Sequence, residues 1–505
     1  LKLDAQGDIF VDGYINWDPG ASGSVELKSA EGEISGFDSG TLSVIKGTLK
    51  LDVGTNAIAE PFEGAIVLSQ GVVLEKDGPG EFVIGPIGGN LNEIHDIYLN
   101  NGSLRLVNTD ALSNYGSPYS GKIHFRGGGF THGSATDFSS NFSNESNQQF
   151  KATVLGSGAT YNTGLQSSGG SFELLGGDLT FAADNTYTGS TTVTSGRLQV
   201  GNDSVSDPAG SLSSTAPLFI ASGAEVQLGN NIEVGSISGS GTIGLGSSPD
   251  EYKLTVGADN TNQTFSGAIQ GTGTLIKKGS GSLNLGLTTS SPSLDIVNAF
   301  QIDDGTLVLS SPETKDIRLD GSISKTTSGP ATLQIETVTG TDLTIDASIV
   351  STSGPLTVQA KSDGSIVLDD GESIQTQGGD IVLWSNTGNI QSGSGEHFIR
   401  LEAGTSLNSS GGKIVLGGGL DGNADEYPDG YAYIGSSVSP PVGSYSGAAL
   451  QPGLSLGSVR DQQGALISIN SGGGDIVMRG RSGVTSTEAD GFGSQRALII
   501  DSGTG

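Results

Sequence analysis

The eight residues GGDIVLWS at 378–385 decide the fold class, because near-copies of them recur in the chain. GGDIVMRG stands at 473–480, and the looser copies DGSIVLDD and GGKIVLGG stand at 363–370 and 411–418. Each copy places glycine or another turn residue ahead of a short aliphatic run. A phrase that recurs in this way indicates a repeat architecture, in which every copy forms the same part of one structural unit.

Successive residues of a β-strand point to opposite faces, so every second residue of this phrase shares a face. Alternation with a period of two is typical of a β-strand that has one buried face. We therefore predict that Ile381 and Leu383 fill a core. Asp380 and Val382 then face outward, and the paired glycines form a corner, because glycine readily adopts the positive φ angles of tight turns.

A second phrase, Gly-x-Leu-x-aliphatic, extends the pattern toward the N-terminus. It reads GTLKL at 47–51, GSLRL at 102–106, GRLQV at 196–200, GSLNL at 281–285 and GTLVL at 305–309. The same alternation predicts that Leu49 and Leu51 point inward and that Lys50 lies in water. Short strands bounded by Gly, Ser, Asn and Asp, with almost no helical periodicity, thus run over the whole length. A β-sandwich would close after about 100 residues.

The spacing of the strands favours a solenoid. From residue 343 onward, apolar runs begin at steps of 9 to 15 residues, at Leu343, Leu356, Ile366, Ile381, Ile390 and Leu401. Pairing every second run gives a period of roughly 20–25 residues, which suits one coil of a parallel β-solenoid. The sequence therefore predicts an all-β fold, a parallel β-helix of roughly 20 coils with no α-helical domain.

The composition excludes several classes of function. Lys and Arg number 23 against 54 Asp and Glu, a formal charge of −31, and such a field repels nucleic acid and anionic membranes. The chain has no cysteine, which removes thiol catalysis and Cys-based metal sites. We predict no cofactor. Surface calcium could settle among the carboxylates, but neither an EF-hand loop nor a calcium-binding nonapeptide array is present.

Four histidines, His95, His124, His132 and His397, are scattered without metal-ligand spacing, so we expect ordinary surface or turn residues. We find no signal peptide or transmembrane span, and no membrane-spanning part is expected in this segment. The sequence begins with Leu1 rather than Met and ends within a repeat. We therefore expect it to be part of a longer polypeptide.

Longer stretches carry a resemblance to known families. Residues 177–202, GDLTFAADNTYTGSTTVTSGRLQVGN, resemble the autotransporter-associated β-strand repeat, with its NTYTGSTTV core and closing SGxLxV phrase. GTGTLIKKGSGSLNLGL at 271–287 resembles the opening half of that repeat, and 121–150 is similar to the segment that often precedes it. This resemblance covers roughly residues 90–310.

From about residue 340, GGDIVLWSNTGNI, SLNSSGGKIVLGGG and NSGGGDIVMRG resemble the repeats of filamentous-haemagglutinin-type surface proteins of bacteria, as does LDAQGDIFVDGYINW at 3–17. The two resemblances together divide the chain into three regions. Residues 1–90 are β-helix coils with a haemagglutinin-like start, and 91–315 carry the autotransporter-associated repeats. Residues 316–505 carry the haemagglutinin-like repeats.

These resemblances imply a right-handed parallel β-helix in the exported passenger region of a bacterial adhesin, located outside the cell or on the outer cell surface. They imply a structural rod for adhesion, cell–cell contact or the assembly of a surface layer or filament, without catalysis. The expected partner is a protein or glycan on a host or neighbouring cell, or identical copies of the chain. The secretion route stays open between autotransport, two-partner secretion and other systems.

The alternative is a carbohydrate-active enzyme, a polysaccharide hydrolase or lyase, built on the same fold. Such a site uses paired carboxylates to protonate a glycosidic oxygen and to activate water. Asp303 with Asp304 and Asp369 with Asp370 are the candidate pairs. Neither has a matching Gly-His-Gly or Arg-Ile-Lys phrase downstream, and Asp-Asp-Gly is common in turns. We therefore expect turn residues and no catalytic residue.

Residues 420–453 interrupt the coil period with tyrosines and prolines, and proline is excluded from inner parallel strands. We predict a loop extruded from the solenoid. Exposed tyrosines suit glycan stacking or protein contact, whereas a loop folded back as a lid over one sheet is the preferred alternative. The candidate partner or glycan contacts are Trp384, Tyr427, Tyr431, Tyr433 and Tyr445.

Alternation places Trp384 outward or at a corner, where packing under a neighbouring loop is favoured over an exposed anchor. A group of phenylalanines matches neither strand alternation nor the coil period. We expect it to fill the corners of the core rather than to form a binding patch; its members are Phe125, Phe130, Phe138, Phe142 and Phe150.

Overall fold

The structure is a computed structural model of the 505-residue chain. It describes residues 1–11, 14–17, 23–31, 34–36, 41–44, 47–55, 62–63, 65–68, 71–85, 95–107, 121–201, 209–247, 250–289, 291–390, 396–434, 454–456, 466–482, 492–494 and 498–501. Two compact units result. Unit 1 comprises Leu1–Gly235 and Gly241–Gly244, and unit 2 comprises Ser236–Ser240 and Leu245–Gly505.

Unit 1 consists of parallel strands stacked in long sheets. The first sheet contains β1 (Lys2–Ala5), β4 (Ser24–Ser29), β7 (Thr48–Val53), β9 (Val73–Asp77), β11 (Asp96–Leu99) and β13 (Ile123–Phe125). The second contains β10 (Glu81–Ile84), β12 (Ser103–Leu106), β14 (Gly129–His132), β15 (Gln149–Val154), β17 (Ser171–Gly176), β19 (Thr191–Val193) and β21 (Pro217–Ile220). The third contains β16 (Ala159–Tyr161), β18 (Asp178–Phe181), β20 (Arg197–Val200), β22 (Glu225–Leu228) and β25 (Thr242–Gly244).

Shorter elements complete unit 1. They are β2 (Ile9–Val11) paired with β5 (Ile34–Gly36), the sheet of β3 (Tyr14–Trp17), β6 (Thr41–Val44) and β8 (Ala65–Leu68), the strand β23 (Ile232–Val234), and one 3₁₀ turn at Ser139–Asn141. That turn is the one helical element among the residues that the structure describes.

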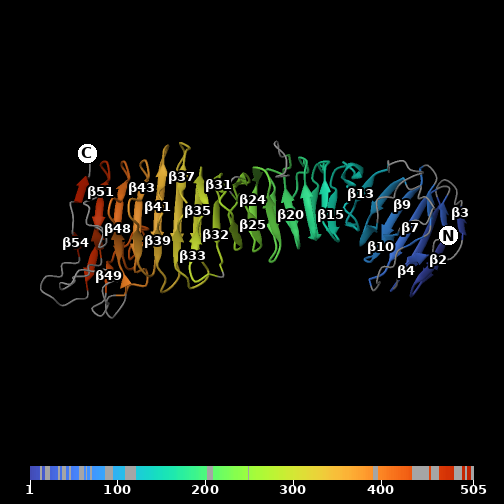
Figure 1. Ribbon diagram of the computed structural model, residues 1–505, viewed down its shortest axis with the longest axis horizontal. Helices are drawn as coiled ribbons and strands as arrows, with labels where there is room; N and C mark the ends of the chain where they lie inside the picture. Colours follow the sequence, from blue (N-terminus) through green and yellow to red (C-terminus); the bar gives the residue numbers. More distant parts are fainter. Residues whose placement is uncertain are drawn as a thin grey trace. The chain divides into compact units, whose positions relative to one another are not determined.

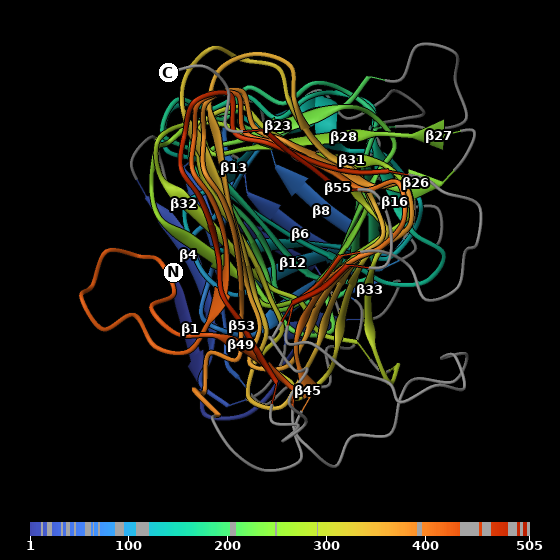
Figure 2. The ribbon, with the colours of Figure 1, turned by 90° about the vertical axis from the view of Figure 1, so that its left-hand side faces the viewer.

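Unit 2 has three sheets that surround a common interior (Figure 2). The main sheet contains β24 (Ser236–Gly239), β29 (Gln263–Phe265), β32 (Ser282–Gly286), β35 (Gly305–Ser310), β38 (Ala331–Glu336), β41 (Leu356–Lys361), β44 (Ile381–Ser385), β48 (Ile414–Gly418) and β52 (Ile476–Met478). The strands follow one another along the stack in sequence order; β38, for example, pairs with β35 on one side and with β41 on the other (Figure 1).

The other two sheets of unit 2 follow the same order. The second contains β28 (Lys253–Val256), β31 (Thr274–Lys277), β34 (Ala299–Ile302), β37 (Ile323–Lys325), β40 (Ile349–Ser351), β43 (Ser373–Gln375), β47 (Ser406–Asn408), β51 (Ile467–Asn470) and β55 (Leu498–Asp501). The third contains β33 (Leu294–Ile296), β36 (Ile317–Leu319), β39 (Leu343–Ile345), β42 (Ile366–Leu368), β46 (Ile399–Leu401), β50 (Leu454–Leu456) and β54 (Phe492–Ser494).

Short strands lie beside these sheets: β45 (Glu396–His397), β49 (Ala432–Ile434) and β53 (Gly480–Ser482), the antiparallel pair β26 (Gly246–Ser247) and β27 (Asp250–Glu251), and β30 (Ala268–Gln270). The architecture confirms the prediction of an all-β parallel β-solenoid. The coil length is less regular than predicted. Partners in adjacent coils lie 25 residues apart at Gln334 and Gln359, 33 at Asp380 and Lys413, and 62 at Ser409 and Ser471. The number of coils therefore differs from the roughly 20 predicted.

The predicted alternation sets the core. Leu49 and Leu51 are fully buried, whereas Lys50 is half-buried and pairs its ammonium with Glu75 at 2.9 Å. Ile381 and Leu383 are fully buried as well. Because each of these inward residues stacks on its partner in the next coil, continuous rows of aliphatic side chains run through the interior at these positions.

The paired glycines of the opening phrase have different roles. Gly378 has a φ of +99°, which favours glycine, and a Cβ there would meet open space apart from one carbonyl oxygen at 3.9 Å. Gly379 has no room for a side chain, because a Cβ would lie 2.3 Å from the carbonyl oxygen of Leu356 in the preceding coil. The first glycine therefore makes the turn, and the second permits the coils to approach.

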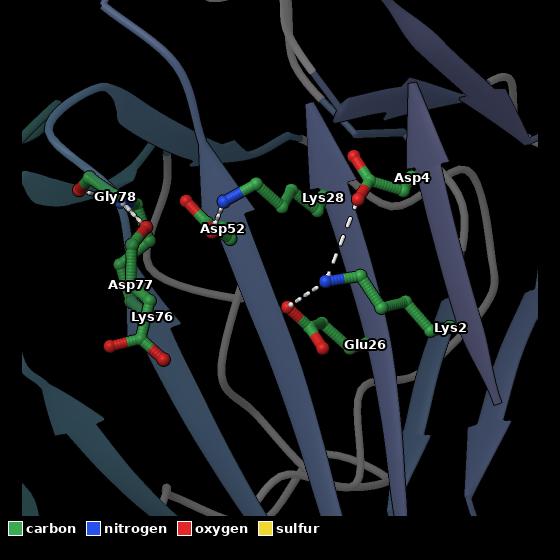
Figure 3. A network of polar contacts seen from close by, with 8 residues as sticks. All are labelled: Lys2, Asp4, Glu26, Lys28, Asp52, Lys76, Asp77 and Gly78. Atoms are coloured by element: carbon green, nitrogen blue, oxygen red, sulfur yellow. Dashed lines mark hydrogen bonds and ion pairs between the residues drawn. The ribbon is translucent and has the colours of Figure 1, made fainter. Parts of the chain in front are cut away.

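The outer face of the first sheet of unit 1 carries a ladder of alternating charges, drawn in Figure 3. Lys2 pairs with Glu26 at 3.2 Å, and Lys28 pairs with Asp52 at 2.7 Å. These pairs join adjacent coils in register, since a one-residue slip would place the partners on opposite faces. Surface ion pairs each contribute only about 0–1 kcal/mol, so they specify register more than they stabilise.

The five phenylalanines lie in the core, as predicted, but Phe125, Phe130 and Phe150 belong to strands β13, β14 and β15 rather than to corners. All are buried, and their rings pack edge to face, with centroids 5.0 Å apart for Phe125 and Phe142 and 5.5 Å apart for Phe130 and Phe138. Phe150 packs against Phe125 at 5.3 Å. The prediction of a filled core, rather than a binding patch, is confirmed at these positions.

The prediction that every histidine is a surface or turn residue is wrong. His132 is 1% exposed, and its Nε2 lies 2.8 Å from the hydroxyl of Tyr161, which is also buried. His124 is buried under a stacking contact with Tyr98, with ring centroids 4.3 Å apart. A buried imidazole needs a polar partner, and His132 has one in Tyr161 while the Nδ1 of His124 lies 3.2 Å from the carboxylate of Glu145. Alternation alone does not reveal such partners.

Candidate functional site

The outer face of the main sheet of unit 2 becomes apolar at β44, β48 and β52. Register places Val382, Val415 and Val477 in one outward row, and Trp384 next to Gly417 in the adjacent row. Earlier coils carry Gln334 and Gln359 in the valine row, so the change of character is local. An apolar outer face requires either a cover or a partner.

The segment 419–431, hereafter the strap, covers this face. Val382, Trp384 and Val415 form one buried cluster, against which Tyr427 of the strap packs. The indole Nε1 of Trp384 donates a hydrogen bond of 2.7 Å to the carbonyl of Gly419, and the residue is 8% exposed. The preferred prediction for Trp384, packing beneath a neighbouring loop, is therefore confirmed. Val382 points outward as predicted but is fully buried, because the strap lies over it.

Polar contacts fasten the strap at its edges. The Tyr427 hydroxyl donates to the carboxylate of Asp380, and the guanidinium of Arg479 donates to the carbonyl of Pro428. The ammonium of Lys413 lies 4.6 Å from the centre of the Tyr427 ring, within the range of a cation–π contact. Burial, followed by the hydrogen bond and charge of Asp380, raises the pKa of the Tyr427 hydroxyl well above its usual value.

A tight acidic turn shapes the outer end of the strap. The carboxylate of Asp421 accepts backbone N–H groups of Asp425 and Glu426 at 3.1 and 2.9 Å, and Asp429 accepts the N–H of Gly422 at 2.9 Å. Desolvation opposes ionisation of Asp421, but the backbone N–H donors outweigh it and lower the pKa of the carboxyl. Across the residues that the structure describes, no group of three or more His, Cys, Asp or Glu side chains is arranged to hold a metal ion.

The structure places the other predicted contact residues as follows. Tyr431, at the end of the strap, is 50% exposed, and so presents its ring to solvent. Tyr433 lies in β49 and pairs antiparallel with His397. Tyr445 and the part of the predicted loop from 435 to 453 lie outside the described residues. For 420–434 the preferred alternative, a loop folded back over one sheet, is confirmed.

The two acidic pairs lie in turns. The Asp304 carboxylate accepts the N–H of Gly305 at 2.7 Å, and Asp303 accepts the side-chain amide of Gln301 at 2.7 Å. Asp369 accepts the N–H of Asp370 at 2.9 Å. The predicted turn role is confirmed by these hydrogen bonds.

The segment that resembles a known repeat also has a definite geometry in unit 1. Asn185 is buried and bridges coils, because its side chain accepts the N–H of Leu165 at 2.8 Å and donates to the carbonyl of Ser211 at 2.7 Å. Tyr187 is fully buried and shares a hydrogen bond with the hydroxyl of Thr191. The NTYTGSTTV phrase therefore encodes contacts between coils rather than an exposed motif.

The chain is thus a parallel β-solenoid whose repeat residues join consecutive coils. A family model for the passenger-associated-transport-repeat matches residues 176–200, which contain β18, β19 and β20. The chain is also similar to the adhesin BmaC autotransporter of Brucella suis biovar 1 (strain 1330), with 28% identity over 259 residues. The match covers 49% of this chain and 7% of that relative. Both findings confirm the predicted resemblance to an autotransporter passenger. No solved structure matches the chain.

The described part of the chain contains no helix of the length and apolar character that crossing a membrane would require. Sequence reasoning did not identify the outer valine row as a covered surface. A signal for it is present in the sequence. At three outward positions of consecutive coils, Val382, Val415 and Val477, the residue is aliphatic rather than polar.

Proposed function

We propose that this chain is a rigid, non-catalytic segment of a bacterial surface adhesin, located on the outside of the cell. The observation that carries the proposal is the parallel β-solenoid with a passenger-associated-transport-repeat at 176–200, together with similarity to part of an adhesin autotransporter. Stacked coils repeat outward side chains at the spacing of adjacent strands, about 4.8 Å. Many weak contacts along such a face add through multivalency.

The proposed partner is a protein or glycan on a host or neighbouring cell, and the strap is the proposed contact region. Its outer end combines the exposed Tyr431 with the exposed Leu420, which is 59% accessible, and carboxylates at Asp421 and Asp429. A half-exposed tyrosine offers a ring for stacking and a hydroxyl for hydrogen bonding. Trp384 and Tyr427 would support this region from beneath rather than touch the partner, because the strap buries Trp384 and holds Tyr427 against the sheet.

Binding of the purified chain to intact cells, and to an array of glycans, tests this proposal. Tyr431→Ala is expected to lower binding at least threefold, because it removes the exposed ring and leaves the contacts of the core intact. Phe219→Ala is the matched control, since Phe219 is a 43% exposed aromatic residue of unit 1 and is not part of the strap. Equal binding by both variants would reject the strap as the contact region, and absence of binding by the wild type would reject adhesion by this segment.

The non-catalytic part of the proposal needs its own assay. Incubation with the same glycans should release no new reducing ends and no unsaturated products. Turnover that disappears in Asp303→Asn would replace the structural proposal with the enzymatic alternative.

A further inference from the structure

Lysines occupy inward positions in both units. In unit 2, Lys277 ends β31 and stands in an inward row between Val256 and Ile302. In unit 1, Lys76 stands in an inward row between Leu51 and Leu99. Lys277 is 1% exposed and Lys76 is fully buried. An ammonium group buried in a row of aliphatic residues is costly unless every donor finds an acceptor.

Carbonyl oxygens surround the ammonium of Lys277. Its Nζ donates to the carbonyls of Lys278 at 2.5 Å and Gly279 at 2.7 Å, which belong to its own corner, and to that of Asp304 at 3.4 Å, which belongs to the corner of the next coil. One ammonium therefore ties two consecutive coils together at the point where the chain turns into the main sheet.

The same cage recurs in unit 1. The Nζ of Lys76 donates to the carbonyls of Asp77 at 2.6 Å and Gly78 at 3.0 Å in its own corner, and to that of Asn101 at 3.3 Å in the next (Figure 3 shows Lys76 beside Asp77 and Gly78). In both units the ammonium thus contacts two carbonyl oxygens of its own corner and one of the next corner. This repeated arrangement indicates a built site.

The length of the corner explains why lysine is required. Six positions separate Lys277 from the next inward residue, Leu283, and six separate Lys76 from Phe82. Five positions suffice where a hydroxyl closes the corner, as from Thr376 to Ile381.

In that shorter corner the Oγ1 of Thr376 donates to the carbonyl of Gly379 at 2.5 Å. The extra residue of the longer corner leaves carbonyls that a hydroxyl would not satisfy, and a long side chain with three donors fills the space.

Glycine in the next coil permits the corners to approach each other and the ammonium. Gly305 has a φ of +68°, and a Cβ there would lie 2.4 Å from the carbonyl oxygen of Gly279 and 2.9 Å from the Nζ of Lys277. Gly102 has a φ of +61°, and a Cβ there would lie 2.2 Å from the carbonyl oxygen of Gly80 and 2.9 Å from the Nζ of Lys76. Burial lowers the pKa of Lys277 to about 8, against the opposing charges of Asp304 and Asp259, so the group still carries its proton at neutral pH.

We propose that the six-residue corner is a binding site for a primary ammonium group, which the chain fills with its own lysine. The N–H donors of this group, rather than the aliphatic stem, join the two coils. A small primary ammonium ion should then occupy the corner when the lysine side chain is removed.

The experiment uses the full chain with Lys277→Met, which keeps most of the stem, and Lys277→Ala, which empties the corner. Lys253→Met is the matched control, because Lys253 is an exposed lysine of β28, adjacent to β31 in the same sheet. Lys277→Met is expected to lower the urea concentration at the unfolding midpoint and to speed amide hydrogen exchange at 279–283 at least tenfold. Lys253→Met is expected to change neither.

Chemical rescue separates the donors from the stem. n-Propylammonium chloride should restore the unfolding midpoint and the exchange protection of Lys277→Ala, whereas tetramethylammonium chloride at equal ionic strength, which has no N–H group, should not. Equal effects of the two salts, or equal stability of Lys277→Met and Lys253→Met, would overturn the proposal. Where Lys277→Ala does not fold in buffer, refolding in n-propylammonium alone supports the site, and failure in both salts contradicts it.

Discussion

His132 shows at the residue scale how a polar group is accommodated in the core of unit 1. Burial lowers its pKa from 6.5 to about 4, while its Nε2 pairs with Tyr161. Because the unfolded chain binds a proton at higher pH than the folded chain, the folded state loses stability as the pH falls from 6.5 toward 4. The full difference corresponds to about 3 kcal/mol.

We therefore expect wild-type unit 1 to unfold at a lower urea concentration at pH 5 than at pH 7. The difference between the two midpoints should be larger for the wild type than for a His132→Gln variant. Near-ultraviolet circular dichroism of the full chain follows the tyrosines of the core. His95→Gln is the control, since His95 is only half-buried. An identical pH dependence for wild type and His132→Gln would show that this histidine is not the titrating group.

Which strand residues point into the core could be predicted for most strands from the sequence. Which outward residues are covered by another segment could not. Period-two alternation correctly placed Leu49, Leu51 and Ile381 in the core. It also put Val382 outward, yet it carries no information on what a segment about 45 residues further along the chain does there. Lys277 is the opposite case, a charged residue at an inward position. Its ammonium is held there by the carbonyls of a longer corner, which hydrophobicity does not predict.

The strap is a covering element whose attachment depends on few contacts. Tyr427→Phe removes the hydroxyl that donates to Asp380 but keeps the ring against the Trp384 cluster. A hydrogen bond to a charged group contributes about 1.5–3 kcal/mol. We expect the substitution to loosen the strap without unfolding unit 2, and so to make Trp384 several times more accessible to acrylamide quenching.

Fluorescence is measured in a Trp17→Phe background, because the chain contains two tryptophans. Tyr431→Phe is the matched control, since Tyr431 is half-exposed and is not part of the buried cluster. If Tyr427→Phe leaves the quenching of Trp384 unchanged, packing alone holds the strap, and the hydrogen bond to Asp380 contributes nothing to its attachment.

At the scale of the whole molecule, the repeat was readable from the sequence, but the length of each coil was not. A coil tolerates insertions at its corners because the strands before and after still stack on the preceding coil. The coil that contains the strap spans 62 residues between equivalent serines, Ser409 and Ser471, without loss of register in β51 and β52. Counting from a mean period therefore misestimates the number of coils wherever the chain extrudes a loop.

The net charge of −31 sets how the whole chain responds to salt, and two effects oppose each other. Salt weakens surface ion pairs such as Lys28 with Asp52, which contribute about 0–1 kcal/mol each. It also screens the mutual repulsion of an excess of carboxylates, which acts on every coil. With 54 acidic residues against 23 basic ones, most carboxylates have no cationic partner available, so relief of repulsion should prevail.

We therefore expect the urea midpoint of the full chain to rise as sodium chloride increases from roughly 50 to 500 mM, a range over which the Debye length falls from about 14 to about 4 Å. Glu26→Gln is the informative variant, because it removes the partner of Lys2 at the cost of one negative charge. Its midpoint should lie close to that of the wild type at both salt concentrations, since the lost pair and the relieved repulsion offset each other. A midpoint that falls with salt would show instead that the charge ladders dominate the electrostatics of the solenoid.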